Sequence, residues 1–114
     1  MILTLSIRNP ETLQGGVPPE FKLARRDAMI GRSKTCDWSL PDTKNFISTR
    51  HAQINFRDDA YYLKDVSTNG TILNGAGSRM TEERKIENGD LFQIGEYEIV
   101  ATNGADTAET TLLE

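Results

Sequence analysis

Short runs in which apolar and polar residues alternate cover most of the chain, and this is the pattern of half-buried β-strands. The first run spans residues 2–7 and the clearest one spans residues 51–57. Further runs are predicted at residues 21–23, 28–30, 38–40, 61–63, 72–73, 91–94 and 97–101. No stretch keeps the 3.6-residue period of an amphipathic helix over three turns. The sequence therefore predicts an all-β chain of many short strands, a sandwich or a small barrel.

Residues that favour turns separate these runs. Pro41-Asp42 ends one of them, and Asn74-Gly75 is a signal for a β-hairpin. The alternation stops after Ala101, and the following residues are small, polar and acidic. We expect one folded domain at residues 1–101, followed by a disordered tail or the start of a linker at residues 102–114.

The composition indicates the class of protein and the cellular compartment. The chain has 114 residues, 37 % apolar and 26 % charged, which fits one globular domain. Its apolar runs are too short to cross a bilayer, and its first residues do not read as a signal peptide. Cys36 is the single cysteine, so no internal disulfide can form, and we expect a reducing compartment, the cytoplasm.

The charge of the chain is unevenly distributed. A net charge of −4 makes the chain a poor candidate for binding nucleic acid, because such binding requires many Lys and Arg contacts to phosphates. Basic residues nevertheless cluster between Arg25 and Arg50, whereas the last thirteen residues contain none. A small basic site on an acidic body favours a compact anion over a polyanion.

Three polar clusters stand at the ends of predicted strands. They are residues 30–33 (Ile-Gly-Arg-Ser), residues 48–51 (Ser-Thr-Arg-His) and residues 65–71 (Asp-Val-Ser-Thr-Asn-Gly-Thr). Strand ends of a sandwich carry its loops, so we predict that these clusters meet and form one anion-binding surface.

The chain resembles a forkhead-associated (FHA) domain over residues 2–101. The matching elements, in order and at the spacing of that family, are Gly31-Arg32, Cys36-Asp37, Ser48 with His51, residues 65–71, Asn74-Gly75, Gly89-Asp90 and Ile94-Gly95. The resemblance implies an eleven-stranded antiparallel β-sandwich of two sheets, with loops at one end that bind phosphothreonine peptides. It also implies a non-catalytic module for phosphorylation-dependent protein–protein interaction.

A narrower resemblance concerns residues 37–42, 46–48, 59–63 and 94–99. These stretches are similar to the FHA domain that begins the FHA proteins of bacterial type VI secretion systems. The resemblance implies a role in regulating the assembly of such a system. Its partner would be a phosphothreonine protein made by a Ser/Thr kinase, either this chain itself or a type VI secretion component.

The resemblance to FHA domains also implies roles for individual residues. A phosphate monoester carries about −1.5 to −2 charges, and it is bound best by a planar guanidinium together with a short hydroxyl donor. The residues implied to contact the phosphopeptide are Arg32, Ser48, Thr49, Arg50, Ser67, Thr68 and Asn69. Those implied to support the site are Gly31, His51 and Gly70. Many family members have a basic residue at the position of Thr49, so we assign Arg50 as an auxiliary contact.

The family reads its peptides three residues after the phosphothreonine. Residues near Phe46-Ile47 and after Asn69 take part in this reading, and Phe46 and Ile72 hint at an apolar preference.

Two other functions compete with phosphothreonine binding. One is a scaffold of the same fold that binds a partner through a sheet face, independently of phosphorylation. The other is an enzyme, but no nucleophile elbow surrounds any serine, and one His and one Cys cannot form a zinc site. A three-residue offset in an extended strand would direct Ser48 and His51 to opposite faces, so we expect His51 to be structural. We expect no catalytic residue, no metal and no cofactor.

The residues after Thr102 contain threonines among acidic residues, namely Thr107, Thr110 and Thr111. A phosphorylated threonine there would bind the predicted site in cis or on a neighbouring copy, and the sequence leaves both arrangements open.

Overall fold

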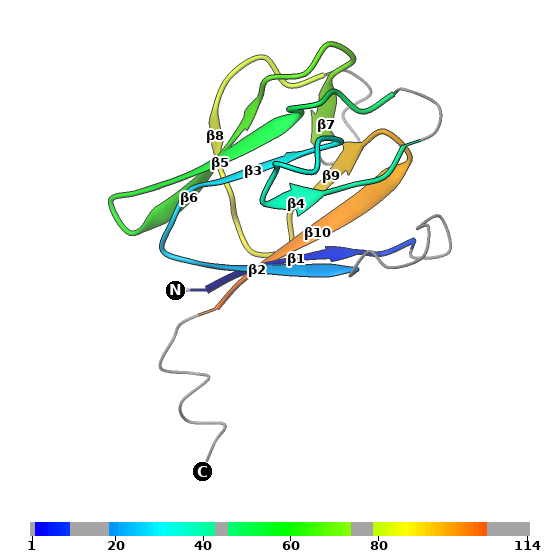
Figure 1. Ribbon diagram of the computed structural model, residues 1–114. Helices are drawn as coiled ribbons and strands as arrows, with labels where there is room; N and C mark the ends of the chain where they lie inside the picture. The colour runs from blue at the N-terminus through cyan, green and yellow to red at the C-terminus, as the bar shows by residue number, and fades with distance from the viewer. Residues whose placement is uncertain (1, 10–18, 43–45, 74–78, 105–114) are drawn as a thin grey trace.

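The computed structural model describes residues 2–9, 19–42, 46–73 and 79–104, and these residues form ten strands and no helix (Figure 1). The strands are β1 (Ile2–Ile7), β2 (Glu20–Ala24), β3 (Ala28–Gly31), β4 (Trp38–Ser39), β5 (Ala52–Arg57), β6 (Ala60–Asp65), β7 (Thr71–Leu73), β8 (Arg84–Lys85), β9 (Leu91–Ile94) and β10 (Tyr97–Gly104). The described residues contain no helix long and apolar enough to cross a membrane.

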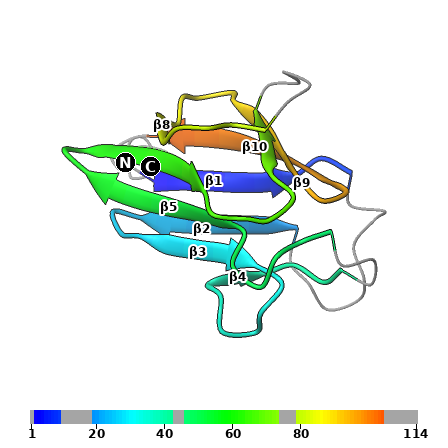
Figure 2. The same cartoon turned by 90° about the horizontal axis from the view of Figure 1, so that it is seen from above.

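The strands form two five-stranded sheets that pack face to face. One sheet has the order β2-β1-β10-β9-β7 and the other has the order β4-β3-β5-β6-β8. Neighbouring strands are antiparallel except β3 and β4, which are parallel, so the second sheet is mixed. The long strands of both sheets run along a common direction when viewed from above, as in an aligned sandwich (Figure 2).

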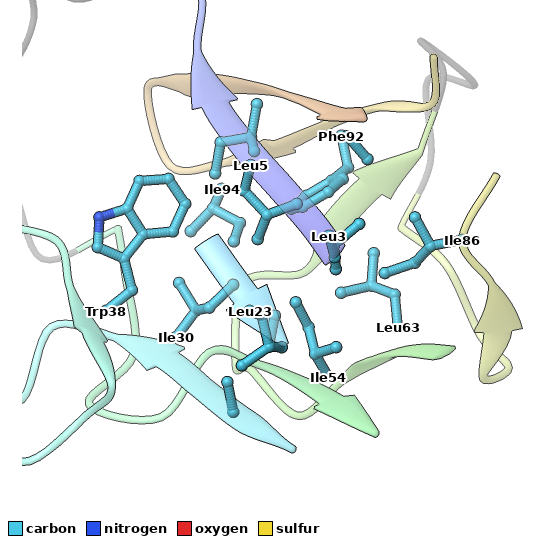
Figure 3. Close-up of a cluster of buried hydrophobic side chains, with 14 of the residues drawn as sticks. Leu3, Leu5, Leu23, Ile30, Trp38, Ile54, Leu63, Ile86, Phe92 and Ile94 are labelled. Atoms are coloured by element: carbon cyan, nitrogen blue, oxygen red, sulfur yellow. The ribbon is translucent and has the colours of Figure 1, made fainter. Parts of the chain in front are cut away.

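The core lies between the sheets and follows from the period-two pattern. In β1, Leu3 and Leu5 are fully buried, while the residues that alternate with them, Ile2, Thr4 and Ser6, are half-buried. Figure 3 shows these leucines with Phe92 and Ile94 of the same sheet, facing side chains of the other sheet such as Ile54. Each fully buried aliphatic or aromatic side chain stabilises the fold by about 1.5–3 kcal/mol.

The predicted fold class is confirmed, with differences in detail. The described residues contain ten strands where eleven were expected. The strand β8 lies between the runs predicted at residues 72–73 and 91–94, where the alternation predicted no strand. The last strand runs to Gly104, three residues beyond the expected end of the domain at residue 101, because it pairs with the whole of β1. The Asn74-Gly75 hairpin and residues 105–114 lie outside the described residues.

Candidate functional site

Main-chain hydrogen bonds bring the loop after β3 against the segment that precedes β5. The amide of Arg32 donates to Ser48 O at 3.0 Å, and the amide of Ser33 donates to Thr49 O at 3.2 Å. A third strand end, the β6–β7 loop, joins them through the amide of Thr68, which donates to Ser48 Oγ at 3.0 Å. The three polar clusters therefore meet at one end of the sandwich, as predicted.

Gly31 permits this close approach. A Cβ atom at this position would lie 2.3 Å from Thr49 O, closer than real side chains come. The same carbonyl accepts from the amide of Ser33 and from the thiol of buried Cys36 at 3.1 Å. Gly31 ends β3, and glycine is required there for the approach of two backbones rather than for an unusual φ.

Arg32 is exposed and is held by only one of its nitrogens. Its Nε donates to Ile47 O at 3.0 Å. Within the described ranges, its two terminal nitrogens make no hydrogen bond or ion pair. The side chain lines a pocket of about 440 Å³ together with Ile47, Ser48, Thr49, Thr68 and Asn69. The free edge of the guanidinium is the edge that can bind two oxygens of an anion.

Ser48 has its hydroxyl hydrogen available in this pocket. Its amide donates to His51 Nδ1 at 3.1 Å, and its Oγ accepts from the amide of Thr68. Within the described ranges Oγ makes no bond as a donor, so the hydroxyl hydrogen can be donated to a ligand.

Asn69 completes the rim of the pocket. Its Nδ2 donates to Phe46 O at 3.0 Å, which fixes the carboxamide and leaves Oδ1 as an acceptor. A peptide main chain offers N–H groups that such an acceptor binds. Thr49 and Thr68 also line the pocket, whereas Arg50, expected as an auxiliary contact, is exposed but is not among the lining residues.

His51 is fully buried and links two of the loops. Its Nδ1 accepts from the Ser48 amide, so the neutral ring carries its proton on Nε2 and donates it to Gly70 O at 2.9 Å. Burial lowers the pKa of His51 below its ordinary value, and the bond to Gly70 opposes this only partly. The structural role expected for His51 agrees with these bonds, but the stated reason was wrong, because residues 48–51 form a bend and not an extended strand.

A second network surrounds the carboxylate of Asp65, whose side chain is 4 % exposed. Its Oδ1 accepts from the amide and hydroxyl of Ser67 and from the hydroxyl of Thr71 at 3.0 Å. Burial alone would raise the pKa of Asp65, but these hydrogen bonds and the one from Arg79 outweigh it and lower the pKa.

Ser67 was expected to contact the phosphopeptide, and the structure does not place it there. Its hydroxyl donates to Asp65 and accepts from the amide of Gly70 at 2.7 Å, so both of its functions are used inside the loop. Gly70 has φ of +103°, which favours glycine, as expected for a turn residue.

Arg79 is the residue of this site that the sequence did not reveal. Its Nη1 donates to Thr68 O at 2.9 Å, and its Nη2 donates to Ser67 O at 2.9 Å and to Asp65 Oδ2 at 2.8 Å. It therefore fixes the β6–β7 loop through two main-chain carbonyls and one carboxylate. It stands in an irregular polar stretch with no period or motif, so no local signal could have identified it.

A smaller pocket adjoins the first at Asn69. It has a volume of about 190 Å³ and is lined by Phe46, Asn69, Gly70, Ile72, Gln93 and Gly95. Phe46 is 46 % exposed, which is unusual for a large aromatic side chain. A pocket that contains the Arg32 guanidinium therefore lies beside a smaller pocket that is partly apolar.

The arrangement is suited to binding and not to proton transfer. Both ring nitrogens of His51 are used in hydrogen bonds to the main chain, and His51 does not line the pocket. Among the residues that the structure describes, no three His, Cys, Asp or Glu side chains are grouped so that they could hold a metal ion. What the pocket presents is a guanidinium edge, a hydroxyl hydrogen and a carboxamide oxygen.

These features define a class: a β-sandwich whose loops at one end form a pocket suited to an anion. The family profile of the FHA domain matches residues 28–95, and the chain belongs to this family. FHA domains are phosphothreonine-binding interaction modules, and the domain itself is not catalytic.

Individual relatives agree with this assignment. The E3 ubiquitin-protein ligase CHFR of Xenopus laevis is 32 % identical over 77 residues, which are 66 % of this chain and 12 % of the relative. The oxoglutarate dehydrogenase inhibitor of Corynebacterium jeikeium is 34 % identical over 89 residues, 77 % of this chain and 58 % of the relative. The chain thus spans only part of the curated relatives it matches.

A solved structure matches almost the whole fold. It comes from a structural and functional analysis of phosphothreonine-dependent FHA domain interactions, and it superposes with a TM-score of 0.74 at 27 % sequence identity. The match covers 92 % of this chain and 99 % of the other.

Proposed function

We propose that this chain binds a phosphothreonine peptide of a partner protein, with the phosphate in the pocket of Arg32 and Ser48. The observation that carries the proposal is the state of Arg32, whose side chain lines the pocket. Its Nε is fixed on Ile47 O, and its terminal nitrogens have no partner in the described part of the chain. A doubly ionised phosphate ester supplies the acceptors that this guanidinium and the Ser48 hydroxyl require.

The peptide main chain would lie along the rim formed by Thr68 and Asn69. Asn69 Oδ1 accepts an N–H of the peptide, and the smaller pocket beside it takes an apolar side chain that follows the phosphothreonine. The apolar carbon of Phe46 and Ile72 is the basis for this preference.

Titration of a phosphothreonine peptide and its unphosphorylated counterpart against the chain tests this function. We expect measurable affinity for the first peptide only. Equal affinities would favour the alternative, a scaffold that binds through a sheet face independently of phosphorylation.

Two substitutions and a control locate the binding. Arg32→Ala removes a charge-assisted bidentate contact of about 1.5–3 kcal/mol, and Arg32→Lys keeps the charge but loses the planar pair of donors. We expect both variants to bind the phosphothreonine peptide more weakly than the parent chain does, and Arg32→Ala to bind it most weakly. Lys22→Ala, at an exposed position of β2 outside the pocket, removes the same charge and should bind as the parent chain does.

For the partner, we propose a component of a bacterial type VI secretion system, or this chain itself, phosphorylated by a Ser/Thr kinase in the cytoplasm. The support is the sequence similarity of residues 37–42, 46–48, 59–63 and 94–99 to the FHA proteins of that system. In a bacterium that carries the system, Arg32→Ala in the full-length protein should lower secretion as deletion of the gene does. Normal secretion by that variant would show that the pocket is not needed for this role.

A further inference from the structure

The phosphate pocket and the end of the last strand lie at opposite ends of the sandwich. Ile2 pairs with Gly104, so β1 begins where β10 ends. At the start of β10, a Cβ atom at Gly95 would lie 2.7 Å from the side chain of Ile47, a residue of the pocket. β10 therefore runs from the pocket to the far end, and in Figure 1 it begins beside β9 and ends near the N-terminus, where β1 begins.

The chain that follows Gly104 is too short to return to its own pocket. β10 has eight residues and spans about 23 Å. Thr110 stands six residues after Gly104, and six residues cover at most about 22 Å even when fully extended. The strand points away from the pocket, so the chain must also reverse, and a turn brings residues three positions apart to within about 7 Å. A turn of about 7 Å followed by three extended residues of about 11 Å falls short of the distance of about 23 Å that β10 covers, so Thr110 does not reach the pocket of its own copy.

The same threonine fits the pocket of another copy. The phosphate pocket and the smaller pocket adjoin at Asn69. An extended peptide advances about 3.3 Å per residue, so a side chain about three positions after the phosphorylated residue reaches the second, partly apolar pocket. Leu113 stands three positions after Thr110.

The neighbouring threonines fit less well by the same criterion. Three positions after Thr107 stands Thr110, and three positions after Thr111 stands Glu114. Neither is an apolar side chain, so Thr110 is the threonine of this segment whose surroundings match both pockets.

Charge also favours this pairing. Residues 105–114 contain Asp106, Glu109 and Glu114 and no basic residue. At the pocket end, Arg32, Lys34 and Arg50 are exposed and form no ion pair within the ranges that the structure describes. An acidic segment is therefore steered toward the pocket end of another copy.

We propose that the phosphothreonine at position 110 of one copy is a ligand for the Arg32–Ser48 pocket of a second copy, so that the chain associates head to tail. The proposal rests on the proposed function of the pocket. A Ser/Thr kinase transfers the γ-phosphoryl group of ATP: the bond to the bridging oxygen of ADP breaks, a bond from phosphorus to Thr110 Oγ1 forms, and the hydroxyl proton is released. Because pocket and ligand lie on different surfaces, the contact is heterologous and produces open chains or rings rather than a closed symmetric dimer.

The test uses the full chain with phosphothreonine incorporated genetically at position 110. Sedimentation velocity over a range of concentrations should show association of this form, whereas the unphosphorylated chain stays monomeric. Adding Arg32→Ala to the phosphorylated chain should return it to the monomer. A phosphorylated chain that stays monomeric at every concentration overturns the proposal.

Mixing two half-competent variants separates trans from cis binding. One carries phosphothreonine at position 110 with Arg32→Ala, and the other is unphosphorylated with an intact pocket and Thr110→Val. Each should be monomeric alone, and together they should form a one-to-one complex. The opposite outcome is that the two variants fail to form a complex, while the chain that carries phosphothreonine at position 110 and an intact pocket does not bind added phosphopeptide. In that case the phosphothreonine occupies the pocket of its own copy, and the proposal is wrong.

Peptides distinguish this proposal from the function on which it rests. We expect a peptide of residues 105–114 phosphorylated on Thr110 to bind, and its Leu113→Ala form to bind about fivefold to tenfold more weakly. The same peptide phosphorylated only on Thr107 should bind more weakly still. If an unrelated phosphothreonine peptide with an apolar residue at the third position binds but the Thr110 peptide does not, the pocket functions and the self-association fails. If neither binds, the proposed function itself fails.

Discussion

Main-chain hydrogen bonds hold the Arg32–Ser48 side of the pocket, whereas the Thr68–Asn69 side depends on side chains gathered around one buried carboxylate. On the first side, the amides of Arg32 and Ser33 bond to the carbonyls of the facing segment. On the second side, Asp65 and Arg79 hold the loop. We therefore expect the fold of the first side to withstand truncation of a single side chain, whereas the fold of the second side depends on Asp65 and Arg79.

The fold of the first side should be lost only when its two backbone segments are forced apart. The substitution that does this, Gly31→Ala, is expected to have the largest effect. In Gly31→Ala, the new Cβ would lie 2.3 Å from Thr49 O, so the two segments must separate. We expect a loss of about 1–3 kcal/mol or more in the free energy of unfolding, together with loss of phosphopeptide binding. Denaturant unfolding and peptide titration measure the two quantities.

Gly89→Ala is the matched control. Gly89 has φ of +91°, but a Cβ there would meet nothing within 4 Å. We expect only the cost of the left-handed backbone, about 1–2 kcal/mol, with peptide affinity unchanged. Similar losses of binding in both variants would show that Gly31 has no special role in the site.

The second side should fail when Arg79 is removed. Arg79→Ala takes three hydrogen bonds from the β6–β7 loop and leaves Asp65 with an unmet acceptor, which costs about 1–3 kcal/mol. We expect phosphopeptide affinity to fall about fivefold to tenfold. This loss is smaller than in Arg32→Ala, because the Arg32 guanidinium stays in the pocket. Isothermal titration of both variants measures the difference.

Arg57→Ala provides the control for Arg79. Arg57 also pairs with a carboxylate, Glu83, but it stands on the outer face of β5 and away from the pocket. We expect its removal to leave peptide affinity unchanged. An equal loss in the two variants would point to net charge rather than to support of the loop.

His51, which links the two sides, should make stability depend on pH. Its pKa is lowered in the folded chain, so the unfolded chain binds the proton first as the pH falls below about 6.5. Stability is therefore complete above the unfolded pKa and falls as the pH decreases from there toward the folded pKa. Denaturant unfolding at several pH values measures this slope. His51 is the only histidine, so a His51→Gln variant with an unchanged slope in this window would contradict the assignment.

The smallest effect concerns the second pocket. Phe46 is 46 % exposed, so Phe46→Ala should change the free energy of unfolding by no more than about 0.5 kcal/mol. It should reduce, severalfold, the preference for a peptide with leucine over one with aspartate three residues after the phosphothreonine. Competition binding with the two peptides measures the preference, and an unchanged ratio would remove Phe46 from peptide selection.

The sequence predicted the sheets and the first side of the pocket because both depend on local patterns. Alternation identified nearly all of the long strands, since burial of one face imposes period two on each of them. The polar clusters that contain Gly31, Arg32 and Ser48 were located at the ends of predicted strands, and the roles of these residues followed from the resemblance to FHA domains.

On the second side Thr68 and Asn69 were expected, but the contacts that hold them could not be predicted, because they join residues that are distant in the sequence. Arg79 reaches Asp65 across fourteen positions and belongs to no motif. Ser67 looked like a ligand residue because it is a serine in a binding loop, and only the structure shows that Asp65 and Gly70 occupy its hydroxyl. Residue type indicates what a side chain can bind, but its neighbours decide what it does bind.

The most direct test of the central claim is a two-dimensional NMR titration of the chain with a phosphothreonine peptide. The account predicts the largest shifts at the Arg32 side-chain Nε–H and at the amides of Ser48, Thr49, Thr68 and Asn69, with none from the unphosphorylated peptide. Shifts centred instead on the outer face of β5 and β6, around Tyr62, or equal shifts with both peptides, would contradict it.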